Sequence, residues 1–195
     1  MHVAVVGGGI VGLASAYYLS KKGVNVTVCE KSNIGAGSTE RSAGGIRTQF
    51  STRVNVALSK ESIKVWEGFE EEFGVDIEYR RSGYLFLARE KETDERFKEN
   101  VEMQNEMGVP SEYLSPEEAL EYCPELHQDR FLSGTYSSTD GFADPHLALQ
   151  GFADRARQEG ADIRTGVDVT DILKEDERVT GVMTKNEEIG ADFVV

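Results

Sequence analysis

Gly7-Gly8-Gly9-Ile10-Val11-Gly12 is the stretch that decides the fold of this chain. The short apolar run His2–Val6 before it is typical of a buried strand. Residues 10–22 after it have the apolar spacing of a helix that ends at Gly23, and residues 24–30 alternate like a second strand. A strand, a glycine turn, a helix and a strand in this order predict a right-handed parallel βαβ unit.

The glycines of this stretch match the pattern G-x-G-x-x-G, and each has a physical task in a dinucleotide-binding turn. Gly7 permits the tight turn out of the strand, and Gly9 lets the backbone approach a pyrophosphate. Gly12 lets the helix pack closely on the sheet. The amides of Ile10 and Val11, at the positive end of the helix dipole, are expected to face the two phosphates.

Glu30 closes the second strand, about twenty residues after the glycine turn, where an acidic residue binds the ribose of a dinucleotide. We expect its carboxylate to accept hydrogen bonds from the adenosine ribose, with Lys31 beside it. A carboxylate there would repel a 2′-phosphate, which disfavours NADP. The alternative is a glycine-rich helix entry that binds nothing, with Glu30 a solvated strand end.

The loop after the second strand, residues 35–47, reads Gly-Ala-Gly-Ser-Thr-Glu-Arg-Ser-Ala-Gly-Gly-Ile-Arg. It resembles the corresponding segment of the D-amino-acid oxidase-like superfamily, most of all the branch of glycine oxidase, the sarcosine oxidase β subunit, dimethylglycine dehydrogenase and related proline dehydrogenase subunits. The resemblance implies FAD as cofactor, with contacts from Ser38, Thr39, Arg41, Gly44, Gly45 and Ile46. The alternative is a flexible glycine- and serine-rich linker. Arg47 is a candidate for a place near the flavin ring, and a structural ion pair is the stronger alternative.

The resemblance continues through residues 114–119 and 140–145 and is clearer again in residues 160–169. It implies that the backbone of Val169 meets the adenine. Residues 191–195 resemble the family strand that precedes another turn near the cofactor. The likeness covers the whole chain but only the N-terminal part of the family's length, so we expect a fragment that does not turn over substrate by itself.

We therefore expect an α/β fold: a Rossmann-like FAD-binding domain of the GR2 type with an inserted α+β substrate domain, truncated at the C-terminus. The expected domains are residues 1–79 and 140–195 for FAD and residues 80–139 for part of the substrate domain. Ser51 or Thr52 is expected to cap a long helix that ends at Gly74. Further helices are expected at residues 91–107, 116–122 and 145–160, and strands at residues 83–88, 132–138, 162–164, 167–173, 179–184 and 193–195.

The resemblance also implies the chemistry, which is hydride transfer to the flavin from the carbon next to a secondary or tertiary amine. The substrate would be a small amine or amino acid, and oxygen or a partner protein would accept the electrons. Residues 33–56 contain no His or Cys, so we expect a non-covalent flavin. No catalytic residue can be assigned. The alternatives are a hydroxy-acid or glycerol-phosphate dehydrogenase of the same superfamily, and a non-catalytic FAD-binding subunit.

The composition is acidic, with 35 Asp and Glu against 21 Lys and Arg and a formal charge of −14. This excess argues against nucleic acid or an anionic membrane surface as partner. It is consistent either with ordinary solubility or with adaptation to high salt. Cys29 and Cys123 are isolated from each other and show no metal-like spacing, which disfavours a disulfide framework and favours a cytoplasmic protein. Both are expected to be buried. His127 and His146 are expected at the surface beside helix caps. The sequence leaves open whether the protein forms an oligomer.

Overall fold

The computed structural model describes all residues, 1–195, and divides them into two compact units. The first unit comprises residues 1–43, 70–77 and 144–195, and the second comprises residues 44–69 and 78–143. Residues 44–69 belong to the second unit, although the expected domain boundary at residue 79 placed them in the first. They do so because Gly45 and Ile46 pair with Phe142 and Gly141. Which unit serves the cofactor and which the substrate stays a prediction.

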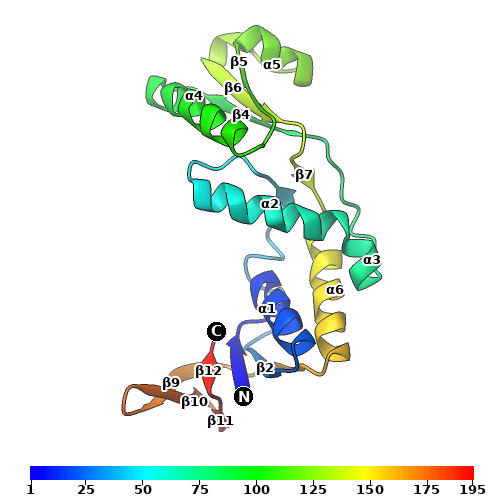
Figure 1. Ribbon diagram of the computed structural model, residues 1–195, viewed down its shortest axis with the longest axis vertical. Helices are drawn as coiled ribbons and strands as arrows, with labels where there is room; N and C mark the ends of the chain where they lie inside the picture. Colours follow the sequence, from blue (N-terminus) through cyan, green and yellow to red (C-terminus); the bar gives the residue numbers. More distant parts are fainter. The chain divides into compact units, whose positions relative to one another are not determined.

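The first unit is built on a parallel sheet in the order β12-β1-β2-β8 (Figure 1). Its strands are β1 (His2–Val6), β2 (Asn25–Glu30), β8 (Asp162–Thr165) and β12 (Phe193–Val194). Both β1 and β2 are buried along most of their length, as expected for parallel strands covered on two faces. With α1 (Ile10–Lys21) between them, they confirm the predicted βαβ unit.

Helices cover one face of this sheet and an antiparallel meander covers the other. Helices α1 and α6 (Pro145–Gln158) pack against each other through aromatic rings of Tyr17, Tyr18 and Phe152. The meander consists of β9 (Val169–Glu175), β10 (Arg178–Thr184) and β11 (Glu188–Gly190). Its Val182 and Ile189 join Ala4 and Cys29 of the sheet in one apolar cluster. The predicted α/β fold of this unit is confirmed, whereas the antiparallel pairing of β9, β10 and β11 was not foreseen.

The second unit contains an antiparallel sheet in the order β4-β6-β5, from β4 (Tyr84–Ala88), β6 (Ser133–Ser137) and β5 (Ser111–Leu114). Helices α2 (Arg53–Glu67), α4 (Lys91–Glu106) and α5 (Pro116–Tyr122) and the 3₁₀ turn η1 (Gln128–Arg130) accompany it. A separate two-stranded ladder joins β3 (Gly45–Ile46) to β7 (Gly141–Phe142). This is the mixed α+β organisation expected for the middle of the chain.

Several expectations about single elements were wrong. The helix expected to run to Gly74 ends at the helix breaker Gly68, and α3 (Phe69–Phe73) follows as a separate turn. The short strands β3, β5, β7 and β11 were not foreseen, because two to four residues carry little periodicity. Strand β9 begins at Val169 rather than at residue 167.

The expectations for the cysteines and histidines are confirmed except at Cys123. Cys29 is buried, as expected, whereas Cys123 is only half-buried because it follows α5 at the surface, where its thiol approaches Glu125. His127 and His146 are exposed, as expected. None of the helices is both long and apolar enough to cross a bilayer.

Candidate dinucleotide site

The turn between β1 and α1 has the backbone geometry that its glycines were expected to provide. Gly7 adopts a φ of +111°, which L side chains rarely reach. A Cβ atom on Gly12 would lie 2.0 Å from Gly7 O, so only glycine lets α1 start so close to the turn. On Gly9 the nearest atom would be Thr39 Oγ1 at 3.4 Å. The turn is therefore tight on its inner side at Gly12 and accessible at Gly9.

The start of α1 offers backbone amides to an anion. Gly9 is the N-cap and supplies no side-chain acceptor, and the helical ladder begins with the amide of Leu13, which donates to Gly9 O at 2.9 Å. The amides of Val11 and Gly12 precede that bond and have no intrahelical partner. Val11 is also exposed. Amides at the positive end of a helix dipole form the arrangement that holds a pyrophosphate.

The loop from residue 35 is a hydrogen-bonded turn that returns to this helix start. Gly35 N donates to Gly8 O at 2.9 Å, and Ile10 N donates to Thr39 Oγ1 at 3.1 Å. A Cβ atom on Gly35 would lie 2.3 Å from Leu149 Cδ2, so the loop also packs tightly on α6. These bonds disfavour the linker interpretation. They bring the Thr39 hydroxyl to the start of α1, where it accepts from the Ile10 amide that was expected to face a phosphate. Ser38 and Arg41 are exposed in the same turn.

Glu30 lies beside the glycine turn, in a role that the sequence pattern did not reveal. Its Oε2 accepts a hydrogen bond from Gly8 N at 2.7 Å and its Oε1 accepts one from Ser32 N at 2.8 Å. The carboxylate thus ties the end of β2 to the turn after β1. Each carboxylate oxygen can accept a second hydrogen bond. The ribose contact therefore stays a prediction that this geometry permits, with Lys31 exposed next to it.

Val169 is the first residue of β9, where it pairs with Thr184 of β10. It is half-buried and packs against the apolar cluster around Ala4 and Cys29. Its side chain is therefore a core contact, and only its backbone remains for the adenine contact that the resemblance implies.

Gly44, Gly45, Ile46 and Arg47 lie in the second unit. The Arg47 guanidinium lies over the rings of Phe50 and Phe86, 5.0 and 5.2 Å from their centroids. These residues line a cavity of about 250 Å³ together with Gln104 and others. The preferred interpretation of Arg47 as half of an ion pair is wrong, because the side chain makes cation–π contacts instead and has no carboxylate within ion-pair distance.

Asp140 is a buried carboxylate that was not singled out as a site residue from the sequence. Its Oδ1 accepts hydrogen bonds from Thr48 N at 2.7 Å and Thr48 Oγ1 at 2.6 Å, and its Oδ2 accepts one from Gln49 Nε2 at 3.1 Å. The signal available was the Asp-Gly-Phe-Ala-Asp-Pro stretch at residues 140–145, which marks a turn and a helix start but not a partner 92 residues away.

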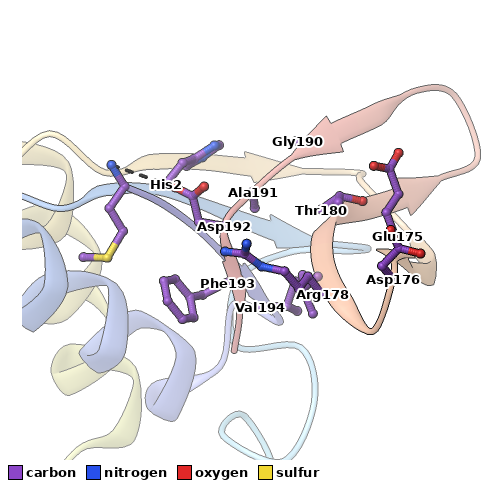
Figure 2. A pocket seen from close by; sticks show the side chains of 12 residues that line it. His2, Glu175, Asp176, Arg178, Thr180, Gly190, Ala191, Asp192, Phe193 and Val194 are labelled. Carbon is purple, nitrogen blue, oxygen red and sulfur yellow. Dashed lines mark hydrogen bonds and ion pairs between the residues drawn. The ribbon is translucent and has the colours of Figure 1, made fainter.

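Another hollow of the first unit lies away from the glycine turn. Figure 2 shows it lined by His2, Asp192, Phe193 and Arg178. The backbone amide of His2 donates a hydrogen bond to Asp192 Oδ2 at 2.7 Å. Its volume is about 1080 Å³, and it opens beside the amino ends of β1 and β12. Ligands of parallel α/β sheets bind at the carboxyl ends of the strands. The hollow is therefore not the dinucleotide site, despite its size.

Taken together, the parallel sheet, the glycine turn and the open helix start define a dinucleotide-binding α/β protein. The family comparison specifies which kind. Residues 2–195 match the model of the FAD-dependent oxidoreductase family, DAO, and the chain belongs to that family. The residues fit an FAD, because unpaired amides, a close-approach glycine and the Thr39 hydroxyl meet at the start of α1.

Three relatives illustrate the match. The sarcosine oxidase β subunit of Arthrobacter sp. is 34% identical, over 98% of this chain and 49% of its own length. The mitochondrial dimethylglycine dehydrogenase of Rattus norvegicus is 32% identical, over 100% of this chain and 23% of its own. The crystal structure of L-proline dehydrogenase from P. horikoshii superposes with a TM-score of 0.87 at 40% identity, over 99% of this chain and 51% of that one. The chain thus spans about half or less of each relative's length.

Proposed function

We propose that this chain binds FAD non-covalently and takes part in the oxidation of a small secondary or tertiary amine or amino acid. The observation that carries the FAD part is the start of α1, where the amides of Val11 and Gly12 precede the helical ladder and Thr39 reaches Ile10. Support for the substrate class comes from the relatives, which are named for sarcosine, dimethylglycine and proline.

The residues have separate parts in this proposal. The turn and α1 bind the pyrophosphate together with the hydroxyl-bearing loop, and the end of β2 and the start of β9 bind the adenosine. The backbone before Arg47 would hold the flavin end of the cofactor. The complete assignment is Gly7, Gly9, Ile10, Val11, Gly12, Ser38 and Thr39 for the pyrophosphate, Glu30, Lys31 and Val169 for the adenosine, and Arg41, Gly44, Gly45 and Ile46 for the flavin side.

Bound FAD would supply the hydride acceptor for oxidation of the carbon next to the amine nitrogen, with oxygen or a partner protein as the final electron acceptor. The chain's own contribution is to bind and orient the cofactor. The glycine turn sets the distance of the pyrophosphate from the sheet. Glu30, bonded to Gly8 and Ser32, is already held at the place where it would meet the ribose.

The cofactor test uses the protein purified without added cofactor, so that any bound cofactor comes from the expressing cells. We expect a yellow protein that releases FAD, and neither FMN nor NAD, on denaturation, as identified by chromatography and mass. Flavin that stays on the polypeptide would contradict the non-covalent attachment. A colourless protein that binds NAD tightly would contradict the choice of cofactor.

The substrate test mixes the flavin-loaded whole protein, rather than residues 1–195 alone, anaerobically with sarcosine, dimethylglycine, glycine or proline. Glycerol 3-phosphate represents the competing class of substrate. Loss of the oxidised flavin absorbance with an amine supports the proposal. Loss only with glycerol 3-phosphate would replace the substrate part and leave the cofactor part intact.

A further inference from the structure

Asp140 is the most deeply buried charged group of the second unit, with none of its surface exposed. It immediately precedes β7, and all three of its side-chain hydrogen bonds go to the two residues Thr48 and Gln49, just beyond β3. A buried carboxylate is costly unless its oxygens are well satisfied. No Lys, Arg or His lies within ion-pair distance of Asp140, so these three donors stabilise it instead.

These bonds extend a pairing that runs along the whole segment 44–49. Ala143 N donates to Gly44 O at 3.0 Å, and β3 then pairs with β7 residue by residue. Asp140 continues this register beyond the two-residue ladder, where no further strand pairing exists. A two-stranded ladder this short is marginal by itself, so the side chain of Asp140 supplies what the backbone does not.

The other side of the Asp140 segment is held just as closely. Gly83 N donates to Asp140 O at 2.8 Å. A Cβ atom on Gly141 would lie 1.9 Å from Arg80 O. The backbone at residue 141 therefore lies so close to Arg80 that only glycine fits there. The backbone that carries Asp140 is therefore held by residues 80 and 83 as well as by its bonds to Thr48 and Gln49.

We propose that Asp140 is a positioning residue for the flavin end of the cofactor. By holding Thr48 and Gln49 it sets the place of the backbone from Gly44 to Arg47, which meets the isoalloxazine ring in the function proposed above, and the inference rests on that function. The adenosine and pyrophosphate contacts belong to the first unit and do not involve Asp140.

The test compares FAD with ADP, which has the adenosine and pyrophosphate but no flavin. Dissociation constants of both are measured for the 195-residue chain and for Asp140→Asn, Asp140→Ala and Thr48→Val. The Asp140→Asn variant keeps an acceptor for Thr48 but opposes the Gln49 amide with a second donor, and Thr48→Val removes only the hydroxyl bond. We expect ADP affinity to change less than about twofold, and FAD affinity to fall about tenfold in Asp140→Ala, which equals about 1.4 kcal/mol.

Asp94→Asn is the matched control. Asp94 is a carboxylate of the same unit that accepts hydrogen bonds from Tyr113 and Lys98 and has no bond to residues 44–49. It should leave the ratio of the two affinities unchanged. At FAD saturation, the visible circular dichroism of the flavin should change in Asp140→Asn and not in the control.

Two outcomes would overturn the inference. One is a parallel loss of FAD and ADP affinity in the Asp140 variants, which would make the residue merely structural. The other is a ratio of FAD to ADP affinity, and a flavin circular dichroism spectrum, that are the same in the variants as in the unaltered chain. Asp140→Asn and Thr48→Val can give this result even if Asp140→Ala does not fold. An unaltered chain that binds neither FAD nor ADP would instead overturn the proposed function, which is a distinguishable result.

Discussion

Glycines that look alike in the sequence meet different physical demands in this protein. Gly12 lies where a Cβ atom would come within 2.0 Å of a backbone oxygen, whereas Gly68 ends α2 with only an ordinary contact of 3.6 Å to Lys64 O. Backbone cannot move aside as a flexible side chain can. The cost of adding one methyl group should therefore depend on the position far more than on the residue type.

Gly12→Ala tests this dependence. We expect the free energy of unfolding to fall by about 1–3 kcal/mol, the usual cost of overpacking, because α1 must move away from the turn. Urea denaturation followed by far-ultraviolet circular dichroism measures the change. Gly68→Ala is the control, for which we expect no loss and a gain of up to about 1 kcal/mol. Equal losses in the two variants would contradict the packing argument.

Glu30 combines a structural role and a proposed binding role in one carboxylate. Glu30→Ala removes the acceptor for Gly8 N and Ser32 N as well as the acceptor for the ribose. We expect FAD affinity to fall at least about tenfold, since a lost charge-assisted bond is worth about 1.5–3 kcal/mol. Glu30→Gln, which keeps one acceptor, should lose less. If affinity is unchanged while the apo chain is destabilised, Glu30 only links β2 to the turn.

At the scale of the element, local capping explains where the helices begin. Thr52 accepts from Asn55 N at the start of α2, and Ser115 and Glu118 form a reciprocal capping box at α5. Asp144 accepts from two amides at the start of α6. These partners are two or three residues apart, so the sequence alone revealed them. The end of α2 at Gly68 is equally local, but a single glycine inside an apolar pattern does not say whether the helix continues.

Helix α4 provides a pH-dependent test. The hydroxyls of Ser133 and Tyr113 and the ammonium group of Lys98 lower the pKa of Asp94 to about 2 from an ordinary value of 3.8. A lowered pKa stabilises the fold above the unfolded-state value, and this contribution is lost as the pH falls through the folded-state value. We expect the stability difference between the unaltered chain and Asp94→Asn to be largest above pH 3.8 and to vanish toward pH 2.

Urea midpoints measured across this pH range show the difference directly. Glu92→Gln serves as the control from the same helical turn, because its only ion pair, with Arg96, is exposed and 3.9 Å long. Such pairs contribute little, so its difference should be small at every pH. A difference for Asp94→Asn that persists unchanged toward pH 2 would contradict the lowered pKa.

For the whole molecule, net charge is the property to test. The formal charge of −14 repels itself in the compact state, and the ion pairs that oppose this repulsion are largely at the surface, such as those of Arg53 with Glu106 and Lys64 with Glu61. We expect the melting temperature to rise as potassium chloride is raised toward molar concentration, where the Debye length is about 3 Å. Sucrose is the control, because it stabilises folded proteins in general without screening charges. A flat or falling melting temperature in salt would favour ordinary solubility as the reason for the acidic composition.

The βαβ unit, the helix starts and the family to which the chain belongs could all be predicted from the sequence. These rest on patterns within one turn of helix, within one strand, or within the roughly thirty residues around Gly7-Gly8-Gly9. Only the tertiary structure decided that Asp140 holds Thr48, that Arg47 stacks on Phe50 and Phe86, and that Gly35 packs against Leu149. Such contacts join residues far apart in the chain, as with the 92 positions between Thr48 and Asp140. They depend on the path of the backbone between the partners, and no local pattern of side chains encodes that path.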